Sequence, residues 1–162
     1  MSDFLDLRLI IDKNCPKLSV LIKNKEHNDD VEGLISAIQE FANKKIPMVT
    51  AYFKNSIVML PQRQIIRLFI SNRRLMVQTS GRVYESKKTL SEVEKILDGE
   101  RFVQISKSEI INLRKVKSFD FSATGTIGVE LENGENTWVA RRRVRFVKEA
   151  LAREENKHGY QA

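Results

Sequence analysis

From residue 49 onward, the sequence is a succession of short apolar segments separated by turn residues, and this spacing constrains the fold more than any other feature. The segments are rich in aliphatic, β-branched and aromatic side chains. Hairpin-like spacing with turn signals such as Ser80-Gly81 is typical of antiparallel β structure. The sequence therefore predicts a mainly β domain with strands at 49–53, 56–60, 65–70, 75–79, 83–87, 101–106, 116–121, 127–132 and 136–140.

Two local signals refine this pattern. Thr89 and Glu92 have the spacing of a capping box and predict a short helix over 89–97. Asn133-Gly134 lies between the last two predicted strands, and both residues tolerate positive φ. We therefore expect one helix within the strand succession and a tight hairpin near its end.

A basic segment follows the last predicted strand. Over residues 141–153, Val144, Val147 and Leu151 form an apolar stripe at helical spacing, which predicts a closing helix. The next residues, 154–162, are polar, and we expect a frayed tail there.

The first 47 residues follow a different pattern. Leu5, Leu7, Leu9 and Ile11 alternate with polar residues, and from Asp29 the apolar positions recur at helical spacing. The expected elements are strands at 5–12 and 18–23 and a helix at 30–43. We predict a small α/β unit over 1–47, ahead of a domain over 48–153. Because a unit of this size is marginal alone, we expect it to pack on the β domain or on a second copy, as a dimerisation or regulatory unit.

Composition favours an anionic partner in a reducing compartment. The 162 residues include 28 Lys and Arg against 21 Asp and Glu, a net charge of +7, and the pI is about 9.6, so nucleic acid is the first candidate. Cys15 is a single cysteine and cannot form an intramolecular disulfide. The acidic N-terminus does not resemble a signal peptide, and no stretch reaches the roughly 20 apolar residues that span a bilayer. We expect a cytoplasmic protein.

An enzymatic function finds little support in the sequence. His27 and His158 lie in polar surroundings, without triad-like or zinc-like spacing. No glycine-rich phosphate loop occurs, and the carboxylates lie mainly at helix-surface and turn positions. We therefore expect no enzyme, no cofactor, no metal and no small-molecule substrate.

Three basic clusters coincide with loops or with the ends of predicted elements. They are 71–74 (SNRR), 107–112 (KSEIIN) and 141–145 (RRRVR). Arginine can bind guanine and asparagine can bind adenine in the major groove, while serine and lysine can hold phosphates. The alternative is that these charges only solvate loop tips and a helix surface.

Residues 102–116 (FVQISKSEIINLRKV) resemble the central signature of the LytTR DNA-binding domain, which has a phenylalanine strand, a serine and an aliphatic pair followed by Asn-Leu. The preceding helix and the following hairpin match in order. The closing glycine hairpin and Ser-Arg-Arg segment of the family correspond to Asn133-Gly134 and 140–143. The similarity covers residues 50 to 152. It implies mainly antiparallel β-sheets with one short helix and a C-terminal helical segment, whose loops enter successive major grooves of duplex DNA.

The resemblance also implies specific DNA contacts. Base contacts fall on Arg73 or Arg74, on Asn112 and on Arg142, although Asn112 could instead cap a turn with its side chain. The candidates for backbone or supporting contacts are Ser71, Asn72, Arg74, Ser106, Lys107, Ser108, Arg141, Arg143 and Arg145. Two positions depart from the family pattern: an arginine replaces the frequent histidine of the first loop, and Ala140 replaces the closing serine.

The function implied is that of a bacterial transcription regulator that binds an operator, with repeated sites about one helical turn apart. Residues 1–47 are too short for a receiver domain, so the chain resembles the stand-alone subclass, in which some members are restrained by a membrane protein. A homodimer is a further expectation. Two alternatives remain: a basic RNA- or ribosome-associated protein, for which RNA would compete as well as DNA, and a protein-interaction module, which would not need Arg142.

Overall fold

The computed structural model describes residues 5–158, and the chain divides into two units, Met1–Lys44 and Lys45–Ala162. The strands lie in the second unit. They are β1 Val49–Phe53, β2 Ser56–Leu60, β3 Ile65–Ser71, β4 Arg74–Thr79, β5 Val83–Ser86, β6 Phe102–Ser106, β7 Glu109–Asn112, β8 Val116–Asp120, β9 Ile127–Leu131 and β10 Asn136–Val139. The helices are α1 Asp29–Asn43, α2 Leu90–Glu94 and α3 Val144–His158, with 3-10 turns η1 Gln62–Gln64, η2 Leu113–Lys115 and η3 Arg141–Arg143.

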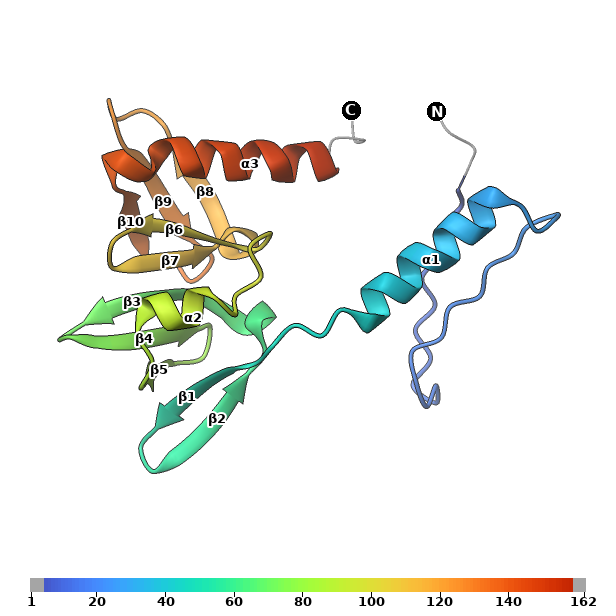
Figure 1. Cartoon of the computed structure of the whole chain (residues 1–162), viewed down its shortest axis with the longest axis horizontal. Helices are drawn as coiled ribbons and strands as arrows, with labels where there is room; N and C mark the ends of the chain where they lie inside the picture. The colour runs from blue at the N-terminus through green and yellow to red at the C-terminus, as the bar shows by residue number, and fades with distance from the viewer. Residues whose placement is uncertain (1–4, 159–162) are drawn as a thin grey trace. The chain divides into compact units, whose positions relative to one another are not determined.

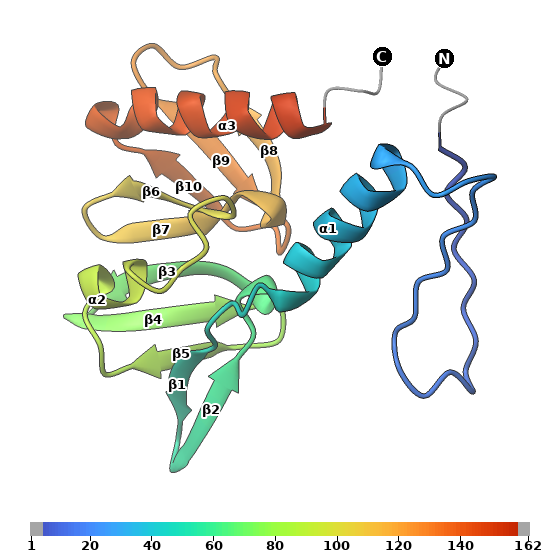
Figure 2. The same cartoon turned by 45° about the vertical axis from the view of Figure 1, so that its right-hand side comes forward.

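The strands form two antiparallel sheets, as expected for a mainly β domain. The larger has the order β2-β1-β5-β4-β3-β7-β6, and the smaller has the order β10-β9-β8. In both views α3 and the smaller sheet lie above the β6–β7 hairpin, whereas α2 lies beside β3 (Figures 1 and 2). The β6–β7 hairpin therefore lies between the two halves of the domain.

Two hydrophobic cores hold these layers together. The first core is formed by β1 to β5, α2 and part of the β6–β7 hairpin, including Leu68, Val77 and Val93. The second lies between the β6–β7 hairpin, the smaller sheet and α3, and includes Ile127 and Val147. Each core contains side chains that are fully removed from water, which is the main stabilising contribution in a domain of this size.

In the second unit, the predicted strands agree with the structure except at β7, which the sequence does not predict. This strand is only four residues long and lies within a basic cluster that the sequence places in a loop. The predicted capping box is confirmed at the start of α2. Thr89 Oγ1 accepts from the Glu92 amide at 3.2 Å, and the Glu92 carboxylate accepts from the Thr89 amide at 2.8 Å. This second bond keeps the pKa of Glu92 below its usual value. The helix ends at Glu94, earlier than predicted.

The C-terminal segment differs from the prediction at both ends. Residues 141–143 form the 3-10 turn η3, and α3 continues to His158. The predicted frayed tail is therefore wrong over 154–158, and residues 159–162 lie outside the described part. The apolar stripe is confirmed, because Val147 is buried and Val144 and Leu151 pack against the second core.

In the first unit, the predicted helix is confirmed as α1, and Asn28 is its N-cap. The Asn28 side chain accepts from the Val31 amide at 3.1 Å. The strands predicted at 5–12 and 18–23 are wrong, because residues 5–28 contain no strand. A two-stranded hairpin is marginal in water unless another element covers its apolar face. None of residues 5–44 is buried, so nothing within the first unit provides that cover.

A polar network joins the two sheets. The Arg67 guanidinium donates to Gln78 Oε1 at 2.5 Å and to Glu109 Oε1 at 3.0 Å, and it also pairs with Glu135, in the β9–β10 turn. Glu109 accepts a second bond from the Thr137 hydroxyl at 2.7 Å. The Arg67 and Glu109 side chains are only 15% and 13% exposed. Charges this far from water stabilise a fold only while each keeps its partner.

We expect the Arg67→Ala substitution to lower the free energy of unfolding by about 3 kcal/mol, because it leaves Glu109 nearly buried without a counterion. Urea denaturation at neutral pH measures this. Arg74→Ala is the matched control, since Arg74 pairs with Glu85 at 2.9 Å on the surface and should cost less than about 1 kcal/mol. Equal losses in the two variants would contradict the proposed role of the network.

Candidate nucleic-acid interface

The first loop is the turn between β3 and β4. Ser71 pairs with Arg74, so Asn72 and Arg73 are the two central residues of a tight hairpin turn. Their φ angles are 50° and 63°, the left-handed geometry that such turns require. Asparagine adopts it readily, but for arginine it costs on the order of 1 kcal/mol. A glycine would form this turn with less strain, so the arginine side chain at its tip is not explained by folding.

The second loop is the turn between β6 and β7. Ser106 Oγ accepts from the Ser108 amide at 3.2 Å and lies 3.3 Å from Ser108 Oγ. These bonds close the turn locally. Lys107 is exposed between the two serines, so the serines position a lysine at the tip.

The third loop is η3, where β10 leads into α3. The Arg143 amide donates to the Ala140 carbonyl at 2.7 Å. Arg141 and Arg142 are exposed, whereas the Arg143 guanidinium lies 5.6 Å from the centre of the Phe146 ring. The turn therefore directs two of its three arginines into solvent.

Backbone hydrogen bonds bring these three loops together, although they are far apart in the sequence. The Ile70 amide donates to the Ser108 carbonyl at 2.9 Å, which joins the first loop to the second. The Ala140 amide donates to the Ile105 carbonyl at 2.8 Å, which joins the third to the second. In both views the β3–β4 turn, the β6–β7 turn and the start of α3 lie along the left side (Figures 1 and 2). We call this the loop surface.

The cations beside the loop tips form ion pairs, whereas those at the tips do not. Arg74 pairs with Glu85 at 2.9 Å, and Arg145 pairs with Glu149 at 3.0 Å. Among residues 5–158, no carboxylate lies within ion-pair distance of the cations at the loop tips, which are Arg73, Lys107, Arg141 and Arg142. Unpaired positive charges on neighbouring loops favour binding of a polyanion.

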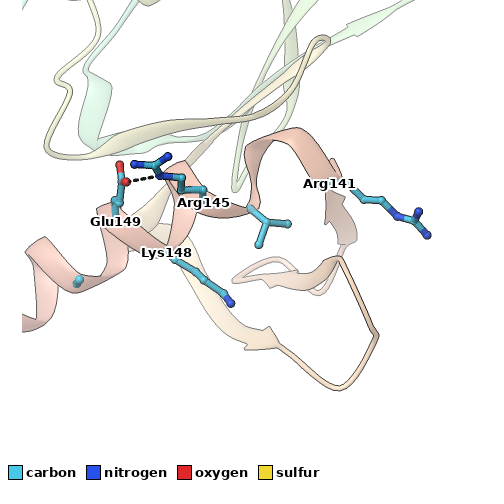
Figure 3. Close-up of a pocket in the computed structure, with 6 residues that line it drawn as sticks. Arg141, Arg145, Lys148 and Glu149 are labelled. Carbon is cyan, nitrogen blue, oxygen red and sulfur yellow. Dashed lines mark hydrogen bonds and ion pairs between the residues drawn. The ribbon is translucent and has the colours of Figure 1, made fainter.

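A shallow depression runs along the exposed side of α3, next to the loop surface. Arg141, Arg145, Lys148 and Glu149 line it together with Val144 and Ala152. Figure 3 shows that the Arg141 side chain points away from the helix, while Arg145 turns toward Glu149. The cations diverge instead of converging on one point, so the depression is not shaped to enclose a small ligand.

Asn112 does not lie on the loop surface, and its predicted base contact is wrong. Its side chain is completely buried. The amide group donates to the Ile65 carbonyl at 2.8 Å, and the side-chain oxygen accepts from the Arg114 amide at 3.0 Å, which caps η2. Both ends of the side chain are bonded within the protein, as the turn-capping alternative required.

The sequence analysis also missed the loop between β8 and β9, which flanks η3. A Cβ at Gly125 would lie 3.7 Å from Arg141 Nε, and the Thr126 hydroxyl donates to the Val139 carbonyl at 2.6 Å. Neither residue belongs to a basic cluster, so charge alone could not have indicated this loop.

The described residues lack two further features. Over residues 5–158, no cluster of histidine, cysteine and carboxylate side chains could hold a metal ion. No helix in the same range is long and apolar enough to cross a membrane.

Comparison with known proteins agrees with this architecture. Residues 55–152 match the family described as the LytTr DNA-binding domain, so the chain belongs to the LytTR family. A solved LytTr DNA-binding domain from Bacillus cereus superposes with a TM-score of 0.62 at 20% identity, covering 65% of this chain and 96% of that one. At this identity the likeness concerns the fold alone.

Similar sequences also occur in Staphylococcus aureus. A protein of strain NCTC 8325 / PS 47, named an uncharacterized HTH-type transcriptional regulator, is 27% identical over 146 residues, which are 90% of this chain and 97% of that protein. A protein of strain MSSA476 with the same kind of name is 28% identical over 142 residues, 88% of each chain. Both similarities extend beyond the DNA-binding domain.

We expect the Asn112→Ala substitution to destabilise the fold by about 2 kcal/mol, since it leaves the buried Ile65 carbonyl and the Arg114 amide without their partners. Urea denaturation measures the loss. The folded fraction should keep its DNA sequence preference. A variant with wild-type stability and a relaxed preference would restore Asn112 as a base-contacting residue.

We expect the Arg73→Gly substitution to raise the free energy of unfolding by up to about 1 kcal/mol, because glycine adopts positive φ without strain, and to weaken DNA binding. Lys54→Gly is the matched control, since Lys54 has a φ of 53° in the β1–β2 turn, which projects away from the loop surface (Figures 1 and 2). The control should gain stability without losing DNA affinity. Equal affinity of both variants for DNA would exclude Arg73 from the interface.

Proposed function

We propose that this chain is a sequence-specific transcription regulator that binds duplex DNA through the loop surface. The proposal rests mainly on one observation. Three loops are fixed to one another by backbone hydrogen bonds, and each presents at least one unpaired cation. Rigid elements that present such loops are suited to reading bases, because the side chains need little ordering on binding. The family and the names of the S. aureus relatives support the regulatory part of the proposal.

Within this surface we assign the base contacts to Arg73, Lys107 and Arg142. Arg74 is less suited because Glu85 already binds its guanidinium. Lysine and arginine can both bind the acceptors of guanine in the major groove. The two outer loops would then read bases on either side of Lys107, in successive major grooves.

The remaining candidates would hold phosphates and fix the loops on the duplex. They are Ser71, Asn72, Ser106, Ser108, Arg141 and Arg143, with Arg145 contributing once it is released from Glu149. Phosphate contacts of this kind set position and carry no base preference.

The finer features of this proposal concern the whole chain. We propose that residues 48–153 form the DNA-binding domain and that the operator repeats its site about one helical turn apart. The protein would act in the cytoplasm, where the DNA is, and a membrane-protein inhibitor is a compatible means of control.

Selection of duplexes from a random library at near-physiological salt tests the function. The wild-type chain should enrich a short motif. Arg73→Ala, Lys107→Ala and Arg142→Ala should each relax the preference at one position and cost about 1–3 kcal/mol in binding free energy. Lys54→Ala is the control and should leave the motif unchanged.

Salt dependence and competition by RNA distinguish DNA binding from the alternative functions. The affinity for the enriched duplex should fall steeply with salt, because phosphate contacts release counterions. If structured RNA competes as well as the duplex, the chain is an RNA-binding protein. If no motif is enriched and the variants bind as the wild type does, the proposed function is wrong.

A further inference from the structure

The β6–β7 hairpin has a second group of cations at the end opposite its turn. Arg101 directly precedes β6, Arg114 lies in η2 directly after β7, and Arg63 lies in η1 directly before β3. In both views β7 runs away from the loop surface toward η2 (Figures 1 and 2). A strand with the five residues of β6 spans roughly 16 Å, so these arginines lie far from Lys107.

Two buried amide side chains fix the segments that carry these arginines. Gln62 Oε1 accepts from the Asp98 amide at 2.8 Å, and the Asp98 carbonyl accepts from the Arg101 amide at 2.9 Å. The buried Asn112 side chain joins the end of η1 to η2 through the two bonds given above. The Leu113 amide also donates to the Arg101 carbonyl at 2.7 Å. The backbone around the arginines is therefore ordered before any ligand binds.

The Arg101 guanidinium has no partner among the described residues. Its Nε atom is buried without a hydrogen bond, and within residues 5–158 no other buried side-chain nitrogen or oxygen lacks one. Burial and then the charge of Arg114 lower the pKa of Arg101, and Arg63 lowers it further. Asp98 and Glu154 act in the opposite direction, but neither is within ion-pair distance of the Arg101 guanidinium. A buried charge without a partner costs stability, so folding does not explain this arginine.

A cavity of about 510 Å³ adjoins these segments. Residues 99–100 and Leu113, which are neighbours of Arg101 and Arg114, line it together with the last turns of α3. Cavities of this size can hold small ligands. The charged residues of the lining are two cations and two carboxylates, Arg153, Lys157, Glu100 and Glu154. Since these charges balance, the adjacent arginines make the region positive.

We propose that Arg63, Arg101 and Arg114 form a binding site for the phosphate group of a small molecule. The guanidinium group presents its N–H donors in a fork that matches phosphate oxygens. A phosphate monoester carries close to two negative charges at neutral pH, so it suits three arginines better than a carboxylate with one charge. The far end of the hairpin does not face the DNA that the loop surface would bind, which favours a free phosphate compound over the phosphates of the duplex. The site does not depend on the proposed function.

Urea denaturation of the full chain in inorganic phosphate, against sodium chloride of equal ionic strength and pH, tests the site. The urea midpoint of the wild type should be higher in phosphate, because a ligand that binds only the folded state stabilises it. Arg101→Met should abolish this rise. In chloride the midpoint of Arg101→Met should equal or exceed that of the wild type, since an apolar side chain replaces an unpaired buried charge. Arg141→Met, which removes an arginine of the loop surface, is the control and should keep the rise.

The NMR signal of the Arg101 Nε–H group distinguishes the two sources of phosphate. Inorganic phosphate should shift this signal until it saturates, whereas the enriched duplex should leave it unchanged. If the duplex shifts it together with the signals of the loop tips, the site binds the DNA backbone and the proposed small ligand is wrong.

Three results of the denaturation experiment would overturn the site itself: no rise in phosphate beyond that in chloride, an equal rise in Arg101→Met, or a lower midpoint of Arg101→Met in chloride. The last result would show that Arg101 supports the fold. Failure of the proposed function is distinguishable, because the response to phosphate would persist while no duplex motif is selected.

Discussion

The β6–β7 hairpin is the element on which the rest of the DNA-binding domain depends, because its side chains enter both hydrophobic cores. Phe102 and Ile110 pack into the first core, while Ile105 and Ile111 pack into the second. At the end of β7, Asn112 bonds to the β3 backbone. The position of this hairpin is therefore fixed from both sides, and its turn is held between two other loops.

Under the proposed function, this constraint would allow loops, and not a recognition helix, to present a defined surface to DNA. The first and third loops each donate a backbone hydrogen bond to a carbonyl of the β6–β7 hairpin, so the three loops are fixed to one another. The cationic side chains at the tips form no ion pair within the described residues. Arg73 also occupies a backbone conformation that favours glycine. Local strain at an exposed cation is expected where function, and not folding, selects the residue.

The sequence predicted the elements that have a local signal. The capping box at Thr89 and the hairpin strands follow from spacing and turn chemistry, and the basic clusters marked all three loops. Tertiary features could not be predicted this way. Asn112 lies in the same cluster as Lys107, but only the register of β7 shows that one is buried and the other is exposed. The period-2 pattern of residues 5–11 predicts a strand, but a strand also needs a sheet partner, and residues 5–28 contain no strand.

The central claim is that the three loops contact DNA as one surface. Backbone amide NMR of the labelled chain, titrated with the enriched duplex, tests it most directly. The account predicts large shift changes that saturate together at residues 72–73, 107–108 and 141–142, with the β1–β2 turn unaffected. Changes confined to one loop, or centred on the outer face of the smaller sheet, would contradict it.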